Sequence, residues 1–152
     1  MKKLKLQQGS TLIEVAVTVL LLSVSLLAMA TLQTRSLQFN QSAAMRTQAN
    51  IYAYDLIDRI RINRGVDSNN IGNYTVAYDA TLSSSNALAV ADVAAWRANI
   101  QRGLPGGKGA ISCDEKTRVC TVSIKWSEEQ IFGAQAAANP EATTELIYTS
   151  GL

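Results

Sequence analysis

Two patterns of apolar residues follow each other along the first 65 positions of the chain. From Ser10 to Ala30 nearly every residue is Leu, Val, Ala, Ile or Thr, and neither Gly nor Pro occurs between Ser10 and Arg64. At about 1.5 Å per residue, a helix over residues 10–30 would span roughly 30 Å, which is the hydrocarbon thickness of a bilayer. The first pattern therefore predicts a transmembrane helix over residues 10–30.

The second pattern is amphipathic and covers residues 31–64. Its apolar positions recur at spacings of four, four, three and four residues: Met45, Ala49, Ala53, Leu56 and Ile60. This is one stripe on a period of 3.6 residues, which is typical of a helix that faces the core of a domain. We therefore expect one helix over residues 10–64, half of it in the membrane and half in a domain.

Charged residues support the second half of this helix. Asp55 with Arg59, and Asp58 with Arg61, are at spacings that favour ion pairs on a helix surface. Gly65 is the first glycine after the apolar run, and a glycine in the left-handed conformation commonly ends a helix. We expect the helix to stop there.

The remaining residues, 65–152, predict a small head with helix and sheet. Residues 67–85 are rich in Asn, Ser, Asp and Tyr and indicate a surface loop or irregular segment, while Leu88–Arg102 is compatible with a short helix. The apolar positions of that helix are Val90, Val93, Trp96 and Ile100. The following "PGGKG" lacks the spacing and the Ser or Thr of a phosphate-binding loop, so we interpret it as a tight turn.

From Gly109 onward the apolar pattern has a period of two. The segments "AISC", "RVCTVSIKW" and "TTELIYTS" alternate between apolar and polar residues, which predicts an antiparallel sheet laid on the helix. The expected fold class is α+β, with a long N-terminal helix packed on a small antiparallel sheet.

Charge predicts the topology of the membrane segment. The formal net charge is only +2, which gives no reason to expect a nucleic-acid partner. Lys2, Lys3 and Lys5 precede the apolar segment and no lysine follows until Lys108, so the N-terminus is expected in the cytoplasm and the head outside it. A cleavable secretory signal is the alternative, because Ala28-Met29-Ala30 has the form of a signal peptidase site.

Two cysteines flank "DEKTRV" in the expected hairpin. In an oxidising compartment Cys113 and Cys120 are most simply a disulfide, whereas a metal site would need more ligands and the chain has no His. The absence of His also removes Ser-His and Cys-His nucleophile pairs, and no paired carboxylates stand out. We expect neither an enzyme, nor a cofactor, nor a bound metal.

The N-terminal motif carries a family resemblance. "GSTLIEV", with a short lysine-bearing leader before it and a continuous apolar helix after it, resembles the class III signal of type IV pilins and pseudopilins. The resemblance implies that residues 1–9 are a prepilin leader, cleaved between Gly9 and Ser10, and that Ser10 becomes N-methylated. It also implies that Glu14 meets the N-terminal ammonium of an adjacent subunit and sets the register of assembly; the alternative is that the Glu14 carboxylate only reaches the membrane interface.

Three further segments make the resemblance specific to one family of pilins. "LIDRIRINRG", "DVAAWRANIQRGLPGGKGAI" and the strand that ends in Trp126 look like the minor pilin family PilV, the type IV pilus modification proteins. This implies a type IV pilin-like fold and a structural subunit near the pilus tip that takes part in initiating assembly. The implied partners are other minor pilins, the major pilin, the prepilin peptidase and the inner-membrane assembly platform.

Two rival interpretations remain open. An I-type minor pseudopilin of a type II secretion system would share the leader, Glu14 and the plan of the head. A signal-anchored periplasmic accessory domain would have no role in a filament and would keep its lysines. Before assembly, the pilin interpretation expects a single-pass protein of the inner membrane with a periplasmic head.

Overall fold

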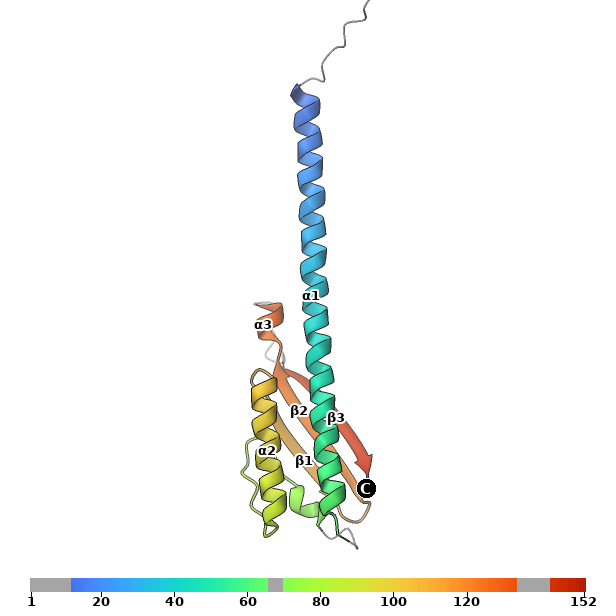
Figure 1. Ribbon diagram of the computed structural model, residues 1–152, viewed down its shortest axis with the longest axis vertical. Helices are drawn as coiled ribbons and strands as arrows, with labels where there is room; N and C mark the ends of the chain where they lie inside the picture. Colours follow the sequence, from blue (N-terminus) through green and yellow to red (C-terminus); the bar gives the residue numbers. More distant parts are fainter. Residues whose placement is uncertain (1–11, 66–69, 134–142) are drawn as a thin grey trace, which may run out of the picture. The chain divides into compact units, whose positions relative to one another are not determined.

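The computed structural model describes residues 12–65, 70–133 and 143–152, which form an α+β protein (Figure 1). Residues up to Phe39 and residues from Asn40 onward form two separate compact units, and each is described by itself. The elements, in chain order, are α1 (Leu12–Asn63), the 3-10 helix η1 (Ile71–Tyr74), α2 (Ala87–Gly103), β1 (Lys108–Asp114), β2 (Val119–Ser127), α3 (Glu129–Phe132) and β3 (Thr143–Gly151).

The head, formed by the residues from Asn40 onward, is built on an antiparallel sheet with the strand order β1-β2-β3. Val122, in the middle of β2, lies opposite Ile111 of β1 and Tyr148 of β3. Alternate residues of β2 are buried, as the period of two predicts. These residues, Cys120, Val122, Ile124 and Trp126, define the core face of the sheet.

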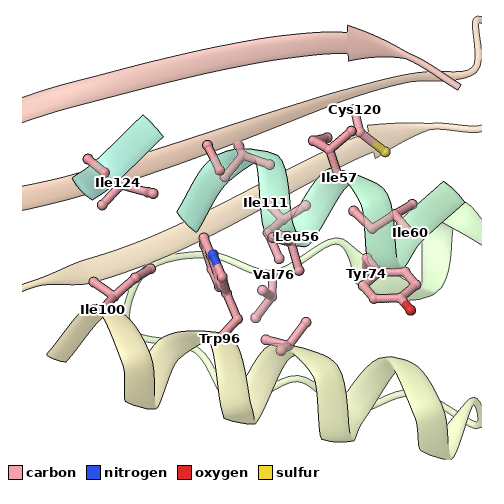
Figure 2. Packing of buried hydrophobic residues seen from close by; sticks show 14 of the residues in the cluster. Leu56, Ile57, Ile60, Tyr74, Val76, Trp96, Ile100, Ile111, Cys120 and Ile124 are labelled. Atoms are coloured by element: carbon pink, nitrogen blue, oxygen red, sulfur yellow. The ribbon is translucent and has the colours of Figure 1, made fainter. Parts of the chain in front are cut away.

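The second half of α1 and the whole of α2 contribute to the core on this face. In Figure 2, Leu56, Ile57 and Ile60 of α1 lie among Trp96 and Ile100 of α2 and side chains from the sheet. Of the predicted stripe, Ala49, Ala53, Leu56 and Ile60 are fully buried and Met45 is half-buried against the core. The helix pattern is thus confirmed, and Ile57 belongs to the same buried surface.

Specific contacts fix the N-terminus and the middle of α2. The Asn86 side chain caps the N-terminus by accepting hydrogen bonds from the amides of Leu88 and Ala89, each at 3.1 Å. Near the middle, the Trp96 indole donates to the Tyr52 carbonyl of α1 at 3.0 Å. A Cβ at Gly109 would collide with the Trp96 ring, so a glycine is required where α2 crosses β1. The predicted short helix is confirmed.

Two predicted breaks in the chain are also confirmed. α1 ends at Asn63, and Gly65 has a φ of +73°. In "PGGKG" the chain makes a tight turn, in which the Gly107 amide donates to the Leu104 carbonyl at 3.0 Å and Gly106 has a φ of +61°.

The segment between α1 and α2 differs from the expectation of a surface loop. Part of residues 67–85 lies outside the described residues, but Ile71, Tyr74 and Val76 are buried in the core. Val76 also pairs with Ile111 of β1 through two backbone hydrogen bonds of 2.8 Å. The prediction of a surface position is wrong for these three residues, because single apolar residues among Asn and Tyr produce no periodic signal.

Candidate assembly site

The processing residues that the family resemblance implies cannot be placed. Gly9 and Ser10 lie outside the described residues. Glu14 is described and lies in the first turn of α1. A carboxylate is favoured there by the partial positive charge at the helix N-terminus. Of the residues assigned to processing or assembly, only Glu14 therefore has a known local setting.

The helix that follows Glu14 is apolar on all its sides. Its large apolar side chains are exposed by between 50% (Val15) and 91% (Leu12), and they lie on every side of the helix rather than in one stripe. They are Leu12, Ile13, Val15, Val17, Val19, Leu20, Leu21, Leu22, Val24, Leu26, Leu27 and Met29. By length and composition α1 could cross a membrane, and its most apolar 18-residue window is entirely unburied within the protein.

The hydroxyl groups in this apolar stretch bond within the helix itself. Each donates to a backbone carbonyl three or four residues earlier, at distances between 2.8 and 3.0 Å. The five residues are Thr18, Ser23, Ser25, Thr31 and Thr34. In hydrocarbon an unbonded hydroxyl is costly, so a hydroxyl that bonds to its own helix is compatible with lipid.

The first buried residue of α1 is Ser42, and its partner is a buried carboxylate. The Ser42 hydroxyl donates to Glu128 Oε1 at 3.0 Å, and the Trp126 indole donates to the same oxygen at 3.3 Å. Ser42 and Glu128 are exposed by only 8% and 7%. A carboxylate buried in this way needs such donors, so the trio ties α1 to the end of β2.

A second polar cluster joins the end of α1 to α2 and η1. Arg59 binds Asp55 at 3.0 Å and Asp92 of α2 at 3.2 Å, and the hydrogen bonds to these two carboxylates raise the pKa of Arg59. The Tyr74 hydroxyl donates to Asp92 at 2.8 Å and accepts from the Asn63 amide at 2.8 Å. Burial raises the pKa of Tyr74 to about 12.

Both predicted ion pairs on the surface of α1 are present. Besides Asp55 with Arg59, Arg61 binds Asp58 at 2.9 Å and also donates to the Ser150 hydroxyl of β3 at 2.9 Å. These contacts are partly exposed, so each contributes little to stability, at most about 1 kcal/mol. Two of the contacts position α1 in the head, because Arg59 links it to Asp92 of α2 and Arg61 links it to Ser150 of β3.

The hairpin between β1 and β2 is closed by a disulfide. Cys113 and Cys120 are direct cross-strand partners with their Cα atoms 4.1 Å apart, and they are joined covalently. In the turn between them, Asp114 accepts from the Lys116 amide at 2.8 Å, and this backbone hydrogen bond lowers the pKa of Asp114. The bridge fixes the register that the strand pairing already specifies.

The outer face of the sheet carries a tyrosine from the segment before α2. The Tyr78 hydroxyl donates to Glu145 Oε1 at 2.6 Å, and Lys125 lies 4.5 Å from the centre of the Tyr78 ring. Burial, followed by the bond to Glu145, raises the pKa of Tyr78. Arg97 of α2 binds the same segment by donating to the Ala77 and Ala80 carbonyls. Burial lowers the pKa of Arg97.

No chemistry beyond binding stands out in the described part of the chain. Within residues 12–65, 70–133 and 143–152, no cluster of three or more His, Cys, Asp or Glu side chains could hold a metal ion. A shallow groove of about 370 Å³ lies beside Tyr78 and is lined mainly by small side chains of the sheet and of the segment before α2. We assign no cofactor to it.

Sequence reasoning missed the residues whose partners lie far away along the chain. Glu128 contacts Ser42 across 86 positions, Tyr78 contacts Glu145 across 67, and Asp92 contacts Arg59 across 33. The i, i+4 rule detects pairs within one helix only. No signal in a single sequence marks these contacts.

Comparison of the chain with models of protein families, with curated proteins and with solved structures finds no match. The assignment of function therefore depends on the residues of this chain and on the resemblance that its motifs carry.

Proposed function

We propose that this chain is a minor pilin, a structural subunit that takes part in initiating type IV pilus assembly with other minor pilins, near the tip. The observation that carries the proposal is the change within α1. Its first part is apolar on every side and unburied, and its second part forms the core of a small α+β head. One helix that combines a membrane-compatible half with a folded head suits a subunit stored in the membrane and then added to a filament.

The proposed topology follows from charge. Lys2, Lys3 and Lys5 precede the apolar helix, so the positive-inside rule favours a cytoplasmic N-terminus and a periplasmic head. The disulfide between Cys113 and Cys120 supports a head in an oxidising compartment. In this topology the prepilin peptidase and the inner-membrane assembly platform act on the N-terminal side, and the apolar helix contacts other pilins.

Glu14 is the proposed assembly residue. A carboxylate within an apolar segment disfavours insertion by up to about 2.5–3.5 kcal/mol at the centre of a span, and by less near its end. Pairing with the N-terminal ammonium of a neighbouring subunit, created by cleavage before Ser10, would offset this cost. The pair would form only between processed subunits, and it would therefore set their axial register.

Intact-mass analysis of the membrane-extracted chain tests the processing step. The expected mass is that of a chain beginning at Ser10, with or without one added methyl group. A chain that begins at Met1 would identify a signal-anchored domain, and one that begins at Thr31 would identify a cleaved secretory signal; either mass would refute the proposal.

Replacing Glu14 with Ala tests the assembly step. We expect the variant to insert into the membrane as well as the wild type but to be depleted from sheared pili, because only the polar partner is lost. The matched control is Ser25→Ala, which removes a hydroxyl bonded within the same helix and should leave incorporation unchanged. Equal recovery of both variants in the pilus fraction would contradict the role of Glu14.

Deletion of the gene separates the pilin from the pseudopilin. Loss of surface pili with normal secretion of exoproteins is the outcome expected for a minor pilin. The opposite outcome would assign the chain to a type II secretion system.

A further inference from the structure

The two edge strands of the sheet, β1 and β3, differ in how their outward-facing backbone groups are bonded. On β1, the edge-facing groups of Gly109, Ile111 and Cys113 are bonded: Arg97 donates to the Gly109 carbonyl, Val76 pairs with Ile111, and the Thr75 hydroxyl bonds the Cys113 amide and carbonyl. On β3, no backbone group of a described residue pairs with the outer edge, and the Gly151 carbonyl there accepts a bond from the Ser150 hydroxyl at 3.1 Å. The β1 edge is closed, and the β3 edge is open within the described structure.

The hydrogen bonds of the sheet show which residues face the open edge. Ile111 directs its amide and carbonyl to Val76, so its cross-strand partner Val122 directs its own groups to Tyr148. Tyr148 and its alternate neighbours therefore bond to β2, and the continuing bond from the Leu152 amide to the Arg118 carbonyl agrees. The residues that face outward are Thr143, Glu145, Ile147, Thr149 and Gly151.

Apart from Glu145, the one charged residue of β3, this edge lacks the features that protect exposed strands. β3 has nine residues in unbroken register with β2, without proline, lysine or a bulge. The apolar side chains beside this edge are also incompletely covered. Ile147 on the outer face is 62% exposed, and Tyr54 of α1, whose ring packs edge-on against Tyr148, is 51% exposed. A further strand would satisfy the backbone groups and cover these side chains.

We propose that the outer edge of β3 binds an extended segment of a different polypeptide, which adds an antiparallel fourth strand to the sheet. A second copy of this chain does not suit the site. Two β3 strands pairing antiparallel are related by a two-fold axis perpendicular to the sheet, and β3 runs in the same direction as the head half of α1 (Figure 1). The head half of the second α1 would run in the opposite direction, whereas subunits added one after another to a filament all run in the same direction; this step rests on the proposed function.

The charges along the edge specify the partner. Arg61 lies at the Ser150 end, on the core face, and Glu145 lies near the other end, on the outer face. Each already has one partner of opposite charge, since Arg61 binds Asp58 at 2.9 Å and Glu145 lies 3.7 Å from Lys125, but their side chains remain 45% and 36% exposed and can take a second partner from an added strand. An antiparallel strand should therefore carry an acidic residue opposite Ser150 and, five residues later, a basic residue opposite Glu145. Because five is an odd number, these two side chains fall on opposite faces, as the two charges require. Apolar residues between them would cover Tyr148, Leu146 and Ile147.

A pair of synthetic peptides of identical composition tests this specification. The peptide SETVVVKTT places its acid opposite Ser150 and its base opposite Glu145, and SKTVVVETT exchanges them. Titration of the fluorescently labelled peptides with the full chain in detergent micelles should show binding of the first, and about tenfold weaker binding of the second. Failure of the first peptide to bind, or equal binding of both, would overturn the proposal.

A variant of the edge separates strand addition from other modes of binding. Ile147→Pro removes an amide that faces the open edge, so it costs no bond to β2, and proline is tolerated at such positions. It should abolish peptide binding, while Ile147→Val should retain it. The fluorescence of buried Trp96 and Trp126 verifies that both variants are folded. Retained binding by Ile147→Pro would refute the edge as the site.

Sedimentation of the chain without peptide tests whether a second copy of the chain binds the edge instead. We expect no dimer that depends on Ile147. A homodimer that Ile147→Pro dissociates would mean that a second copy occupies the edge, and would overturn the proposal. None of these measurements depends on processing at Ser10 or on pili, so the proposed function can fail while strand addition stands, and the reverse.

Discussion

The two halves of α1 use the same kinds of residue for different purposes. Up to Phe39 the apolar side chains lie on all sides of the helix and are exposed, whereas from Asn40 to Asn63 most of them form a stripe that the head buries, and Ile51, Tyr54 and Ile62 are the large apolar side chains that stay exposed. Serine shows the same contrast. Ser25 bonds to the carbonyl of Leu21 within its own helix, while Ser42 bonds to Glu128 of the head.

The difference shows that each half is adapted to a different environment. An exposed helix that is apolar all round needs another apolar surface or lipid around it, and its hydroxyls must be satisfied internally. A helix with one apolar stripe needs only its own domain, and its polar groups can form specific long-range contacts. Substitutions of one residue type in the two halves should therefore have unequal effects on the stability of the head.

The largest difference is expected for leucine. Leu56→Ala should reduce the free energy of unfolding of the head by about 2–5 kcal/mol, because Leu56 is fully buried and its removal leaves a cavity. Leu22→Ala should leave it unchanged, because Leu22 is 64% exposed within the protein. Denaturant titration in detergent, followed by tryptophan fluorescence, reports the head alone, since Trp96 and Trp126 both lie in its core.

Equal destabilisation by the two leucine substitutions would break the comparison. It would mean that the first half of α1 packs against the head and that its exposed apolar surface has another explanation. A matched pair such as Ile57→Val and Ile13→Val extends the test to smaller changes of volume, for which the buried site should cost about 0.5–1.5 kcal/mol and the exposed site nothing.

The disulfide is the next largest effect. Replacing Cys113 and Cys120 with Ser should lower the stability of the head by about 2–3 kcal/mol in the chain-entropy account of a short closed loop. Under the proposed function, membrane extraction depends on the other half of α1 and should be unaffected. Thiol labelling of the denatured, unreduced wild type provides the control: two labelled cysteines would show that the bridge does not form in the cell.

The two serines give a smaller and sharper comparison. Ser42→Ala removes one of the two donors to buried Glu128 and should cost about 1–3 kcal/mol, whereas Ser25→Ala should not change the unfolding of the head. The same denaturant titration measures both. If Ser42→Ala has no effect, the trio of Ser42, Trp126 and Glu128 does not hold α1 to β2.

Much of the fold could be predicted because its signals are local. The stripe from Met45 to Ile60, the α2 pattern around Trp96 and the alternation in β2 each follow from the geometry of one element, and the structure confirms them. The left-handed Gly65 was equally readable, because glycine is the residue that most often ends a helix in this way. An element with a strong period of apolar residues can therefore be predicted from its own sequence alone.

The parts that could not be predicted depend on contacts between elements. Burial of Ile71 and Tyr74 follows from the position of η1 against β1 and α2, which no periodicity in "NNIGNY" indicates. The Glu128 carboxylate is acceptable in the core only because Ser42 and Trp126 reach it. The open edge of β3 likewise follows from strand order and not from the composition of the strand.

The last expected effect is a pH dependence that belongs to the head half alone. Burial raises the pKa of Tyr74 to about 12 from a usual value near 10, so the folded head holds this proton more tightly than the unfolded chain. The corresponding stabilisation is complete below pH 10 and is lost as the pH rises from about 10 to about 12. Denaturant titrations at several alkaline pH values should show a steeper loss of stability for the wild type than for Tyr74→Phe, which has no phenol to ionise. Tyr78 also has a raised pKa and is present in both proteins, so it cancels in the comparison.

The two proteins should differ by a constant amount below pH 10, set by the lost bonds to Asn63 and Asp92. Parallel curves through the alkaline range would show that the Tyr74 proton is not held by the folded head.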